Sequence, residues 1–391
     1  MDTKRFSGLS LRQIKTPCFI IDEGALEENL KILDSLQKKA GCKILLALKA
    51  YSMYSTFPLI RKYLYGVCAS GINEAKLGKE EFGREVHTFA PAFADEEFKE
   101  VIKYSTHIVF NSFSQFERFK PMLKNKKIKI GLRVNPEKSV ASVKFGVYDP
   151  CTKNSRLGIK AKDLTGKDLK GITGLHFHCL CEQNVGPLEE VLKAFEEKFS
   201  PYIKKMSWVN FGGGHLITKD DYNREKLIKL IVNFKKRYQN IKEVYLEPGE
   251  AVVLNAGIMV VSVLDIIHNE KDIAILDTSV ESHIIDVLIT RNEPAAYIPE
   301  ILGAGKPDQY KYSYILGGVS CAAGDVIGEY SFQKPLKPGD KLIFLDMAYY
   351  TMVKTNTFNG VNLPTILLRD KKGKIKLIKK FDYEDFKRRL S

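Results

Sequence analysis

The chain has 391 residues, 44% of them hydrophobic and 28% charged, which is typical of a folded globular protein with room for a large barrel and a second module. Its formal net charge is +14, but the lysines are scattered along the chain beside acidic residues, and this pattern disfavours nucleic-acid binding. No apolar run approaches the roughly 18 residues of a membrane span. Seven cysteines without paired spacing predict a cytoplasmic protein with reduced thiols rather than a disulfide framework.

Short apolar runs alternate with longer amphipathic segments over the first two-thirds of the sequence. The leucines between Leu26 and Leu36 are spaced by three and four residues, as on one face of a helix. Alternation of strands and helices predicts parallel pairing, and eight such units predict a closed (β/α)8 barrel over residues 23–262, with an insertion at 136–173. The predicted strands are 43–49, 66–70, 85–90, 107–111, 129–135, 174–179, 207–214 and 244–249.

The pattern changes after about residue 260. Apolar segments are then separated by breaks that contain Gly and Pro, without a long helical period, which predicts an antiparallel β-domain. We expect this β-sandwich or β-barrel domain to comprise 1–22 plus 263–391, and to end in a strand and a helix after Lys371. Its predicted strands are 16–22, 258–267, 271–279, 311–318 and 341–347.

Lys49 follows the apolar run ILLAL at the end of the first predicted barrel strand. The carboxyl ends of the strands are where (β/α)8 enzymes place their chemistry. A lysine there either leaves the core for solvent or forms a Schiff base with an aldehyde, for which its amine must lose a proton. The position alone is compatible with both interpretations.

Two further motifs end the last two predicted barrel strands. Gly212, Gly213 and Gly214 expose backbone N–H groups at the place where barrel enzymes commonly bind a phosphate. Glu247, in LEPGE, either caps a loop or faces a ring nitrogen and keeps it protonated, as pyridoxal phosphate requires.

The stretch GLHFHCLCEQN at 174–184 contains two histidines and two cysteines. Because side chains alternate along a strand, His176 and His178 share one face while Cys179 points to the other. This arrangement, with its C-x-C and H-x-H spacing, disfavours a zinc site. We expect His178 to stack on a planar cofactor at the mouth of the barrel, and His176 to be structural.

Motifs along nearly the whole length resemble those of the alanine-racemase-type pyridoxal-phosphate decarboxylases, the family of diaminopimelate and ornithine decarboxylases. They are, in order, TPCFIID, LALKA, CASGINE, LHFHCLCE, FGGG, EPGE, SCAAGD and DMAYYTMVKTNTFNG. The resemblance implies a barrel that binds pyridoxal 5′-phosphate, a C-terminal β-domain that includes the N-terminal strand, and a homodimer with two shared active sites.

The resemblance also implies roles for residues of the predicted barrel. Lys49 would bond covalently to the cofactor, His178 would stack on its ring and Glu247 would bind the ring nitrogen. The phosphate would be held by Gly212 to Gly214 and by Tyr350 of the β-domain.

Two residues of the predicted β-domain complete the site that the resemblance implies. Cys321, supplied by the neighbouring subunit, would protonate the substrate carbon after carbon dioxide has left. Asp325 would contact the distal amine of the substrate.

Three departures from the family pattern bear on the substrate. Residues 321–325 are C-A-A-G-D where diaminopimelate decarboxylases have C-E-S-x-D, Glu250 replaces an arginine, and Cys181 replaces a serine. The missing glutamate and arginine argue against a second carboxylate and favour a cationic tail, as in the carboxynorspermidine (carboxyspermidine) decarboxylase branch, which acts on carboxylated polyamines. Asp325, Glu329 and Glu250 are the predicted partners of that tail.

Other hypotheses stay open on the sequence. Diaminopimelate, ornithine and arginine are alternative substrates for a decarboxylase of this family. A catalytically inactive binding protein of the same fold is a rival from another class, although it predicts loss of the lysine, the acid or the phosphate loop, and all three are present.

Overall fold

A computed structural model describes residues 4–11, 13–140, 148–293 and 296–391. The chain forms two compact units, one of Glu27–Val252 and one of Met1–Leu26 with Val253–Ser391. In the described part of the chain, no helix has the length and apolar character needed to span a membrane.

The unit Glu27–Val252 contains a closed barrel of eight strands, which follow one another around the ring in chain order. All neighbouring strands pair in parallel, including the first with the last. The eight strands predicted from the apolar runs are therefore confirmed. They are β2 (Lys43–Ala47), β3 (Gly66–Ala69), β4 (Glu85–Phe89), β5 (His107–Phe110), β6 (Lys129–Arg133), β7 (Gly174–His176), β8 (Trp208–Asn210) and β9 (Glu243–Leu246).

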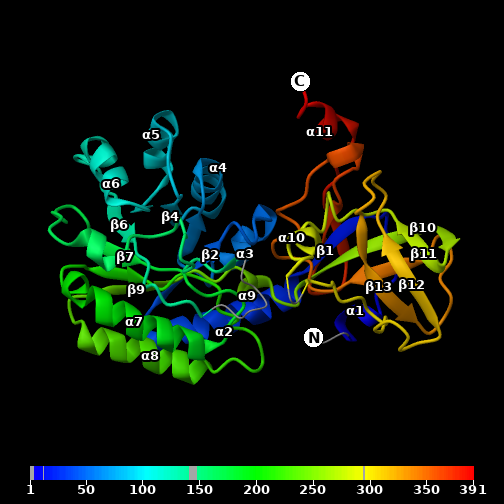
Figure 1. Ribbon diagram of the computed structural model, residues 1–391, viewed down its shortest axis with the longest axis horizontal. Coiled ribbons are helices and arrows are strands. Elements are labelled where there is room, and N and C mark those ends of the chain that lie inside the picture. The colour runs from blue at the N-terminus through cyan, green and yellow to red at the C-terminus, as the bar shows by residue number, and fades with distance from the viewer. Residues whose placement is uncertain (1–3, 12, 141–147, 294–295) are drawn as a thin grey trace. The chain divides into compact units, whose positions relative to one another are not determined.

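Helices lie outside the ring of strands, as Figure 1 shows for α7 (Val185–Ile203) and α8 (Arg224–Arg237), drawn in green. The predicted leucine stripe lies in α2 (Glu23–Ala40), where all of its leucines are buried. The other helices around the barrel are α3 (Phe57–Ile60), α4 (Ile72–Leu77), α5 (Asp95–Tyr104), α6 (Phe113–Phe119) and α9 (Glu250–Val253).

Trp208 fills much of the barrel interior. Its side chain is fully buried and packs against Tyr245. A Cβ atom at Gly174 would lie 2.0 Å from the indole, and one at Gly131 would lie 2.5 Å from it. Glycines at these positions of β7 and β6 therefore leave the space that the indole occupies.

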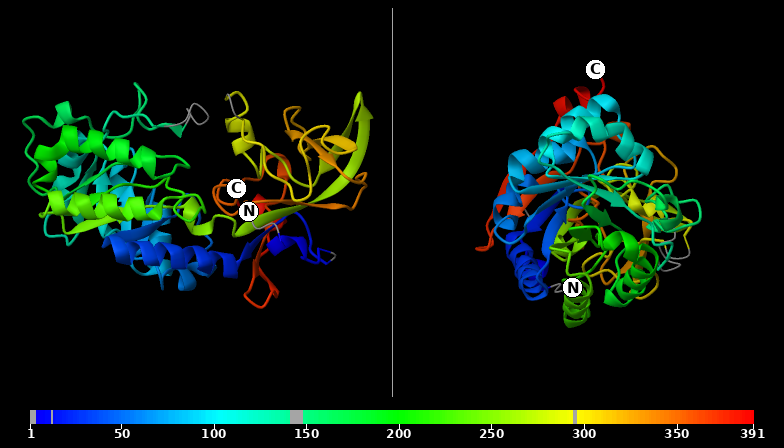
Figure 2. Two further views of the ribbon diagram at one scale, coloured as in Figure 1. Left: turned by 90° about the horizontal axis from the view of Figure 1, so that it is seen from below. Right: turned by 90° about the vertical axis from the view of Figure 1, so that its left-hand side faces the viewer.

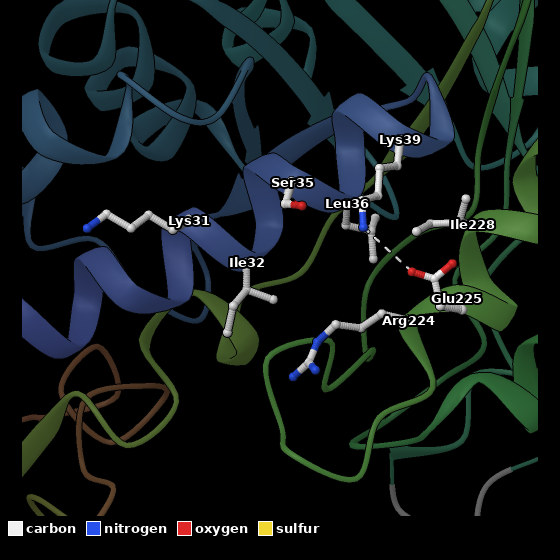
Figure 3. A pocket seen from close by; sticks show the side chains of 8 residues that line it. All are labelled: Lys31, Ile32, Ser35, Leu36, Lys39, Arg224, Glu225 and Ile228. Carbon is white, nitrogen blue, oxygen red and sulfur yellow. Dashed lines mark ion pairs between the residues drawn. The ribbon is translucent and has the colours of Figure 1, made fainter.

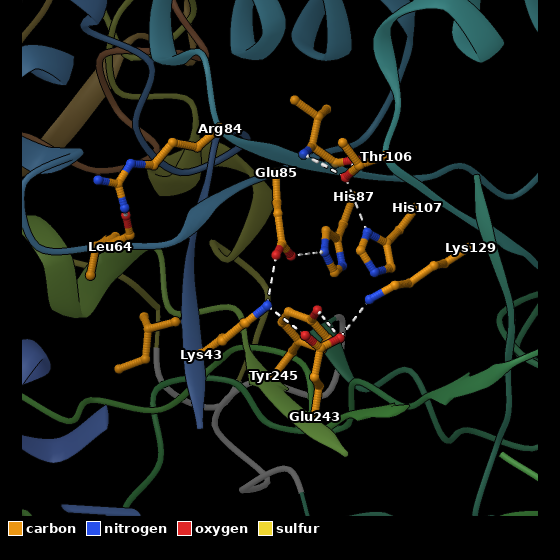
Figure 4. A network of polar contacts seen from close by, with 12 residues as sticks. Lys43, Leu64, Arg84, Glu85, His87, Thr106, His107, Lys129, Glu243 and Tyr245 are labelled. Atoms are coloured by element: carbon orange, nitrogen blue, oxygen red, sulfur yellow. Dashed lines mark hydrogen bonds and ion pairs between the residues drawn. The ribbon is translucent and has the colours of Figure 1, made fainter. Parts of the chain in front are cut away.

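A charged network closes the end of the barrel where the strands begin (Figure 4). Lys43 Nζ lies 2.7 Å from Glu85 Oε1 and 2.6 Å from Glu243 Oε1. His87 Nε2 lies 3.2 Å from Glu85 Oε2, and the rings of His87 and His107 stack with their centroids 3.7 Å apart. In (β/α)8 barrels this end contributes to stability rather than to chemistry.

Among the described residues, Glu85, His87 and His107 are the one group with potential ligand atoms close enough to share a metal ion, all within 4.8 Å. The two imidazole planes lie only 20° apart. Their in-plane lone pairs therefore lie in two nearly parallel planes, with the ring centroids 3.7 Å apart, and do not converge on one ion as tetrahedral coordination requires. Because the Lys43 ammonium also contacts Glu85, we interpret the group as a structural network.

The second unit is a sheet built from both ends of the chain. Its strands are β1 (Cys18–Asp22), β10 (Gly257–Asn269), β11 (Lys271–Leu276), β12 (Tyr312–Gly317), β13 (Val326–Phe332), β14 (Lys341–Phe344), β15 (Thr365–Arg369) and β16 (Ile375–Lys379). Strand β1 lies between β10 and β15, so the N-terminal strand belongs to this unit as predicted. Most pairs are antiparallel, but β1 pairs in parallel with β15, and β11 with β12. Strand β10 is the long curved yellow-green strand in Figure 2.

Acid should destabilise the barrel through the network in Figure 4. Burial, and then the charge of His87, lowers the pKa of His107 from 6.5 to about 2. Between these two pH values the unfolded chain binds more protons at His107 than the folded chain does. The free energy of unfolding is therefore unaffected by protonation of this group above pH 6.5 and decreases as the pH falls below it. One such group changes the free energy of unfolding by about 1.4 kcal/mol per pH unit.

We expect the free energy of unfolding, measured with denaturant between neutral pH and about pH 5, to fall less steeply in His107→Phe than in the unchanged protein. His268→Phe is the matched control, because the His268 side chain is 72% exposed. Equal pH slopes for His107→Phe and the unchanged protein would contradict this assignment.

Candidate active site

Four of the predicted site elements follow four strands that are neighbours in the closed ring. His178 follows β7, the triplet Gly212–Gly214 follows β8, Glu247 follows β9, and Lys49 follows β2. Because parallel strands all end at the same side of a barrel, the structure brings these elements together at its carboxyl mouth.

Glu247 is held by the last residues of the two preceding strands. Asn210 Nδ2 donates to Glu247 Oε1 at 2.7 Å, and His176 Nε2 lies 3.2 Å from Glu247 Oε2. Burial acts to raise the pKa of this carboxyl, but the charge and hydrogen bond of His176, the charge of His87 and the bond from Asn210 outweigh it and lower the pKa to about 2. The carboxylate therefore stays ionised at neutral pH and can accept a hydrogen bond from a protonated ring nitrogen.

His178 is oriented by the glycine triplet. The Gly213 N–H donates to His178 Nδ1 at 2.8 Å, so in the neutral ring the proton lies on Nε2. Burial, and then the positive charge of Lys49, lowers the pKa of His178 well below its usual value. A neutral imidazole with a fixed orientation suits stacking against a planar cofactor.

The glycine triplet is packed against the strand ends on both sides. Gly212 and Gly214 have φ values of 73° and 80°, a region that L side chains rarely adopt. A Cβ atom at Gly214 would lie 2.0 Å from the Leu180 carbonyl oxygen, and one at Gly213 would lie 2.2 Å from the Glu247 carbonyl oxygen. Only glycine allows the three loops to approach so closely.

The N–H groups of the triplet differ in what they bind. The Gly212 N–H donates to Asn210 Oδ1 at 2.8 Å, and the Gly213 N–H donates to His178. The Gly214 N–H has no hydrogen-bond partner among the described residues. Of the three predicted phosphate donors, Gly214 is therefore the one whose N–H is available to an anion.

The side chain of Lys49 is exposed at the mouth of the barrel rather than enclosed by apolar residues. Its positive charge acts to lower the pKa values of His178, Cys68 and Glu74. Glu74 accepts a hydrogen bond from the Ser70 N–H at 2.6 Å, and burial raises its pKa. The lysine amine thus lies among polar groups at the site that His178 and Glu247 define.

Sequence reasoning missed the roles of His176 and Asn210, which bind Glu247. The sequence predicts only a structural role for His176 and indicates none for Asn210. The available signal was the alternation in HFH and in WVN, which directs both side chains toward the inside of the barrel.

The four side chains of the His/Cys stretch lie in different environments. His176 contacts Glu247 and His178 contacts Gly213, whereas Cys179 Sγ lies 3.4 Å from Cys151 Sγ. Cys181 is half-buried beyond the strand end. The predicted strand 174–179 ends at His176 in the structure, so His178 and Cys179 lie beyond it. The two histidines and Cys179 nevertheless contact different partners, so the four side chains do not form one metal site.

In the second unit, Cys321 and Asp325 share the loop between β12 and β13. Cys321 is exposed, while Asp325 is buried and its carboxylate accepts N–H bonds from Val280 at 2.8 Å and Ser320 at 3.0 Å. Glu329 lies four residues further along β13, or about 13 Å at the usual strand rise. There it forms an ion pair with Lys271 at 2.8 Å, so the structure does not bring Glu329 and Asp325 together.

Tyr350 and Glu250 lie in different units. Tyr350 has a φ of 50°, and the Lys354 ammonium lies 4.8 Å from its ring centroid. Lys354 also forms an ion pair with Asp286 at 2.6 Å. Glu250 is buried at the first position of α9, which follows the last barrel strand.

A pocket of about 320 Å³ lies between α2 and α8 (Figure 3). Lys39 and Glu225 form an ion pair of 3.6 Å across it. Its lining residues belong to helices outside the ring of strands and include none of the predicted site residues. We therefore assign the chemistry to the mouth of the barrel.

Comparison with known proteins gives concordant results. Residues 18–348 match the family model described as pyridoxal-dependent decarboxylase, C-terminal sheet domain. A carboxynorspermidine/carboxyspermidine decarboxylase of Campylobacter jejuni is 47% identical, over 96% of this chain and 98% of its own. A carboxyaminopropylagmatine decarboxylase of Synechocystis is 41% identical, over 97% of this chain and 96% of its own. A crystal structure of carboxynorspermidine decarboxylase from Campylobacter jejuni, complexed with norspermidine, has a TM-score of 0.87 and 46% identity, covering 96% of this chain and all of that one.

Replacing Gly214 should test how tightly the loops at the mouth are joined. Gly214→Ala requires a positive φ and a Cβ atom against Leu180, so we expect it to lower the free energy of unfolding by about 3 kcal/mol or more. Gly186→Ala is the matched control, because a Cβ atom at Gly186 meets nothing within 4 Å and its effect should stay within about 1 kcal/mol. Denaturant unfolding measures both; equal stability of the two variants would refute the packing argument.

Proposed function

The chain belongs to the pyridoxal-dependent decarboxylase family, and we propose that it decarboxylates carboxynorspermidine or carboxyspermidine to norspermidine or spermidine. The observation that carries this proposal is the 47% identity to a decarboxylase of these compounds over nearly the full length of both chains. The proposal places the enzyme in polyamine biosynthesis and, because its cysteines are free thiols, in the cytoplasm.

The residues at the barrel mouth fit pyridoxal phosphate. The ionised Glu247 matches a protonated ring nitrogen, the neutral His178 offers a flat face, and the Gly214 N–H is available to the phosphate. In this proposal Lys49 attaches the cofactor through its amine. Tyr350 completes the phosphate site formed by the loop Gly212 to Gly214, in which the Gly214 N–H is the available donor.

When bound, the cofactor would supply an acceptor for the electron pair that stays on Cα when carbon dioxide leaves the substrate. Glu247 keeps the ring nitrogen protonated, which favours this charge distribution. Cys321 then supplies the proton that replaces the carboxyl group: its S–H bond breaks, a C–H bond forms at Cα and a thiolate remains. Each turnover thus replaces one carboxylate by one hydrogen and releases carbon dioxide, and the thiolate regains its proton from solvent.

The cationic tail of the substrate requires acidic partners. Asp325 uses two of about four acceptor positions of its carboxylate on backbone N–H groups, which leaves capacity for an ammonium group. Glu250 is buried beside the barrel mouth, while Glu329 is engaged by Lys271. We therefore rank Asp325 first, Glu250 second and Glu329 third as tail partners.

One relative indicates a second candidate substrate. The Synechocystis protein that is 41% identical is a carboxyaminopropylagmatine decarboxylase. Carboxyaminopropylagmatine also joins one amino-acid head to a cationic tail, which ends in a guanidinium group. Acidic side chains that bind a cationic tail therefore suit both substrate types.

The substrate assignment is tested by carbon dioxide release from a panel of carboxynorspermidine, carboxyspermidine, carboxyaminopropylagmatine, diaminopimelate, ornithine and arginine. We expect kcat/KM to be highest for the first two. Lys49→Ala should abolish both turnover and the absorbance of the cofactor imine, because no other group supplies that amine. Lys62→Ala, at another exposed lysine of the barrel unit, is the control and should keep both. Preference for diaminopimelate, or turnover in Lys49→Ala, would contradict the proposal.

We further propose that the protein is a homodimer in which Cys321 serves the site of the partner subunit. Lys49→Ala and Cys321→Ala homodimers, each inactive, should regain activity when they are mixed and exchange subunits. A hybrid dimer then contains one intact site, so an equal mixture should reach about a quarter of the activity of the unchanged protein. Failure to complement, despite subunit exchange verified by mass spectrometry, would show that the sites are not shared.

A further inference from the structure

The side chain of Asn359 contacts Cys321 through both ends of its amide. Its Oδ1 accepts the Cys321 backbone N–H at 2.9 Å, and its Nδ2 lies 3.2 Å from Cys321 Sγ as a donor. These two contacts join segments that are 38 residues apart in the sequence. One side chain thus binds the backbone of the cysteine and also contacts its sulfur.

Asn359 is itself held in place by its surroundings. Its φ of 60° lies in the left-handed region, which asparagine tolerates better than most residues. Three residues earlier, Asn356 donates to the Glu281 carbonyl at 2.8 Å and accepts the Phe358 N–H at 2.8 Å. The Asn356 N–H also donates to the Ser282 carbonyl at 2.9 Å. The turn that carries Asn359 is therefore anchored to the segment around residue 281.

The loop of Cys321 is also anchored to this segment, through Asp325. Asp325 accepts the N–H groups of Val280 and Ser320, and Arg291 donates to the carbonyl oxygens of Gly324 and Val326 at 2.8 and 3.0 Å. Asp325 and Arg291 are thus bonded to the backbone, whereas the amide of Asn359 contacts the sulfur.

We propose that Asn359 is a positioning residue for Cys321, which holds the thiol in place and stabilises the thiolate left after proton transfer. This inference rests on the proposed role of Cys321 as the acid. An N–H donor binds a thiolate more strongly than a thiol, because hydrogen bonds to charged acceptors are the stronger ones. Asn359 therefore favours release of the proton to Cα.

Asn359→Asp separates the two contacts. The carboxylate keeps an acceptor for the Cys321 N–H and tolerates the left-handed backbone, but it offers no donor and places negative charge beside the sulfur. Asn359→Gly removes both contacts without backbone strain. Asn125→Asp is the matched control, since Asn125 is exposed and has a similar φ of 64° but lies in the barrel unit.

The experiment measures alkylation of Cys321 by iodoacetamide as a function of pH in the holoenzyme, with the modified peptide quantified by mass spectrometry. In Asn359→Asp we expect the midpoint of the rate profile to move up by about one pH unit and the rate at neutral pH to fall about tenfold. We expect a smaller upward shift in Asn359→Gly and none in Asn125→Asp. With the preferred substrate, kcat of Asn359→Asp should fall about tenfold while KM changes less than about twofold.

An unchanged alkylation midpoint in Asn359→Asp would overturn the proposal. So would an equal shift in Asn125→Asp, because the effect would then not be local. The alkylation profile needs no substrate, so it stands even if the unchanged protein decarboxylates none of the panel. In that case the proposed function is wrong, but the alkylation profile still shows whether Asn359 stabilises the Cys321 thiolate.

Discussion

The ionised carboxylate of Glu247 is the charge around which the barrel mouth is organised. Asn210 and His176 bind its two oxygens, so residues from three neighbouring strand ends fix one negative group. The same Asn210 amide also binds the Gly212 N–H. The adjacent Gly213 N–H orients His178, so the loops that carry Glu247 and His178 are linked by hydrogen bonds. A change at any one of these strand ends therefore affects the electrostatics of the whole site.

The two ends of the barrel use polar residues in opposite ways. At the end where the strands begin, Lys43, Glu85 and Glu243 satisfy one another, and two buried imidazoles stack beside them. At the other end, Lys49 is exposed and the Gly214 N–H is available. Groups that satisfy one another lower the free energy of the fold, whereas groups left available can bind a ligand. Stability and chemistry are thus assigned to opposite ends of the same eight strands.

The sequence predicted the barrel well because each of its strands is a short, buried apolar run between helical segments, a pattern that depends only on local residues. Strands β13 and β15 were not predicted. The first half of β13 contains exposed and half-exposed residues, while β15 has one buried residue and depends on pairing with β1, which lies far away in the chain. The partners of Glu247 were missed for the same reason. Asn210 and His176 reach it only because β7, β8 and β9 are neighbours in the closed ring. Family resemblance supplied roles for Cys321 and Asp325, but their hydrogen-bond partners required the structure.

A cationic substrate for a chain of net charge +14 is consistent with local rather than global electrostatics. Most lysines in the described ion pairs lie on the surface, where solvent and salt screen their charge. Asp325 is buried, and its carboxylate is bound by backbone N–H groups rather than by a lysine or arginine side chain. No cationic side chain therefore neutralises this carboxylate, which in the proposed function leaves it able to bind an ammonium group of the substrate. The same hydrogen bonds fix the loop that carries Cys321. In the proposed enzyme, the carboxylate that recognises the tail thus also helps to place the acid that acts on Cα.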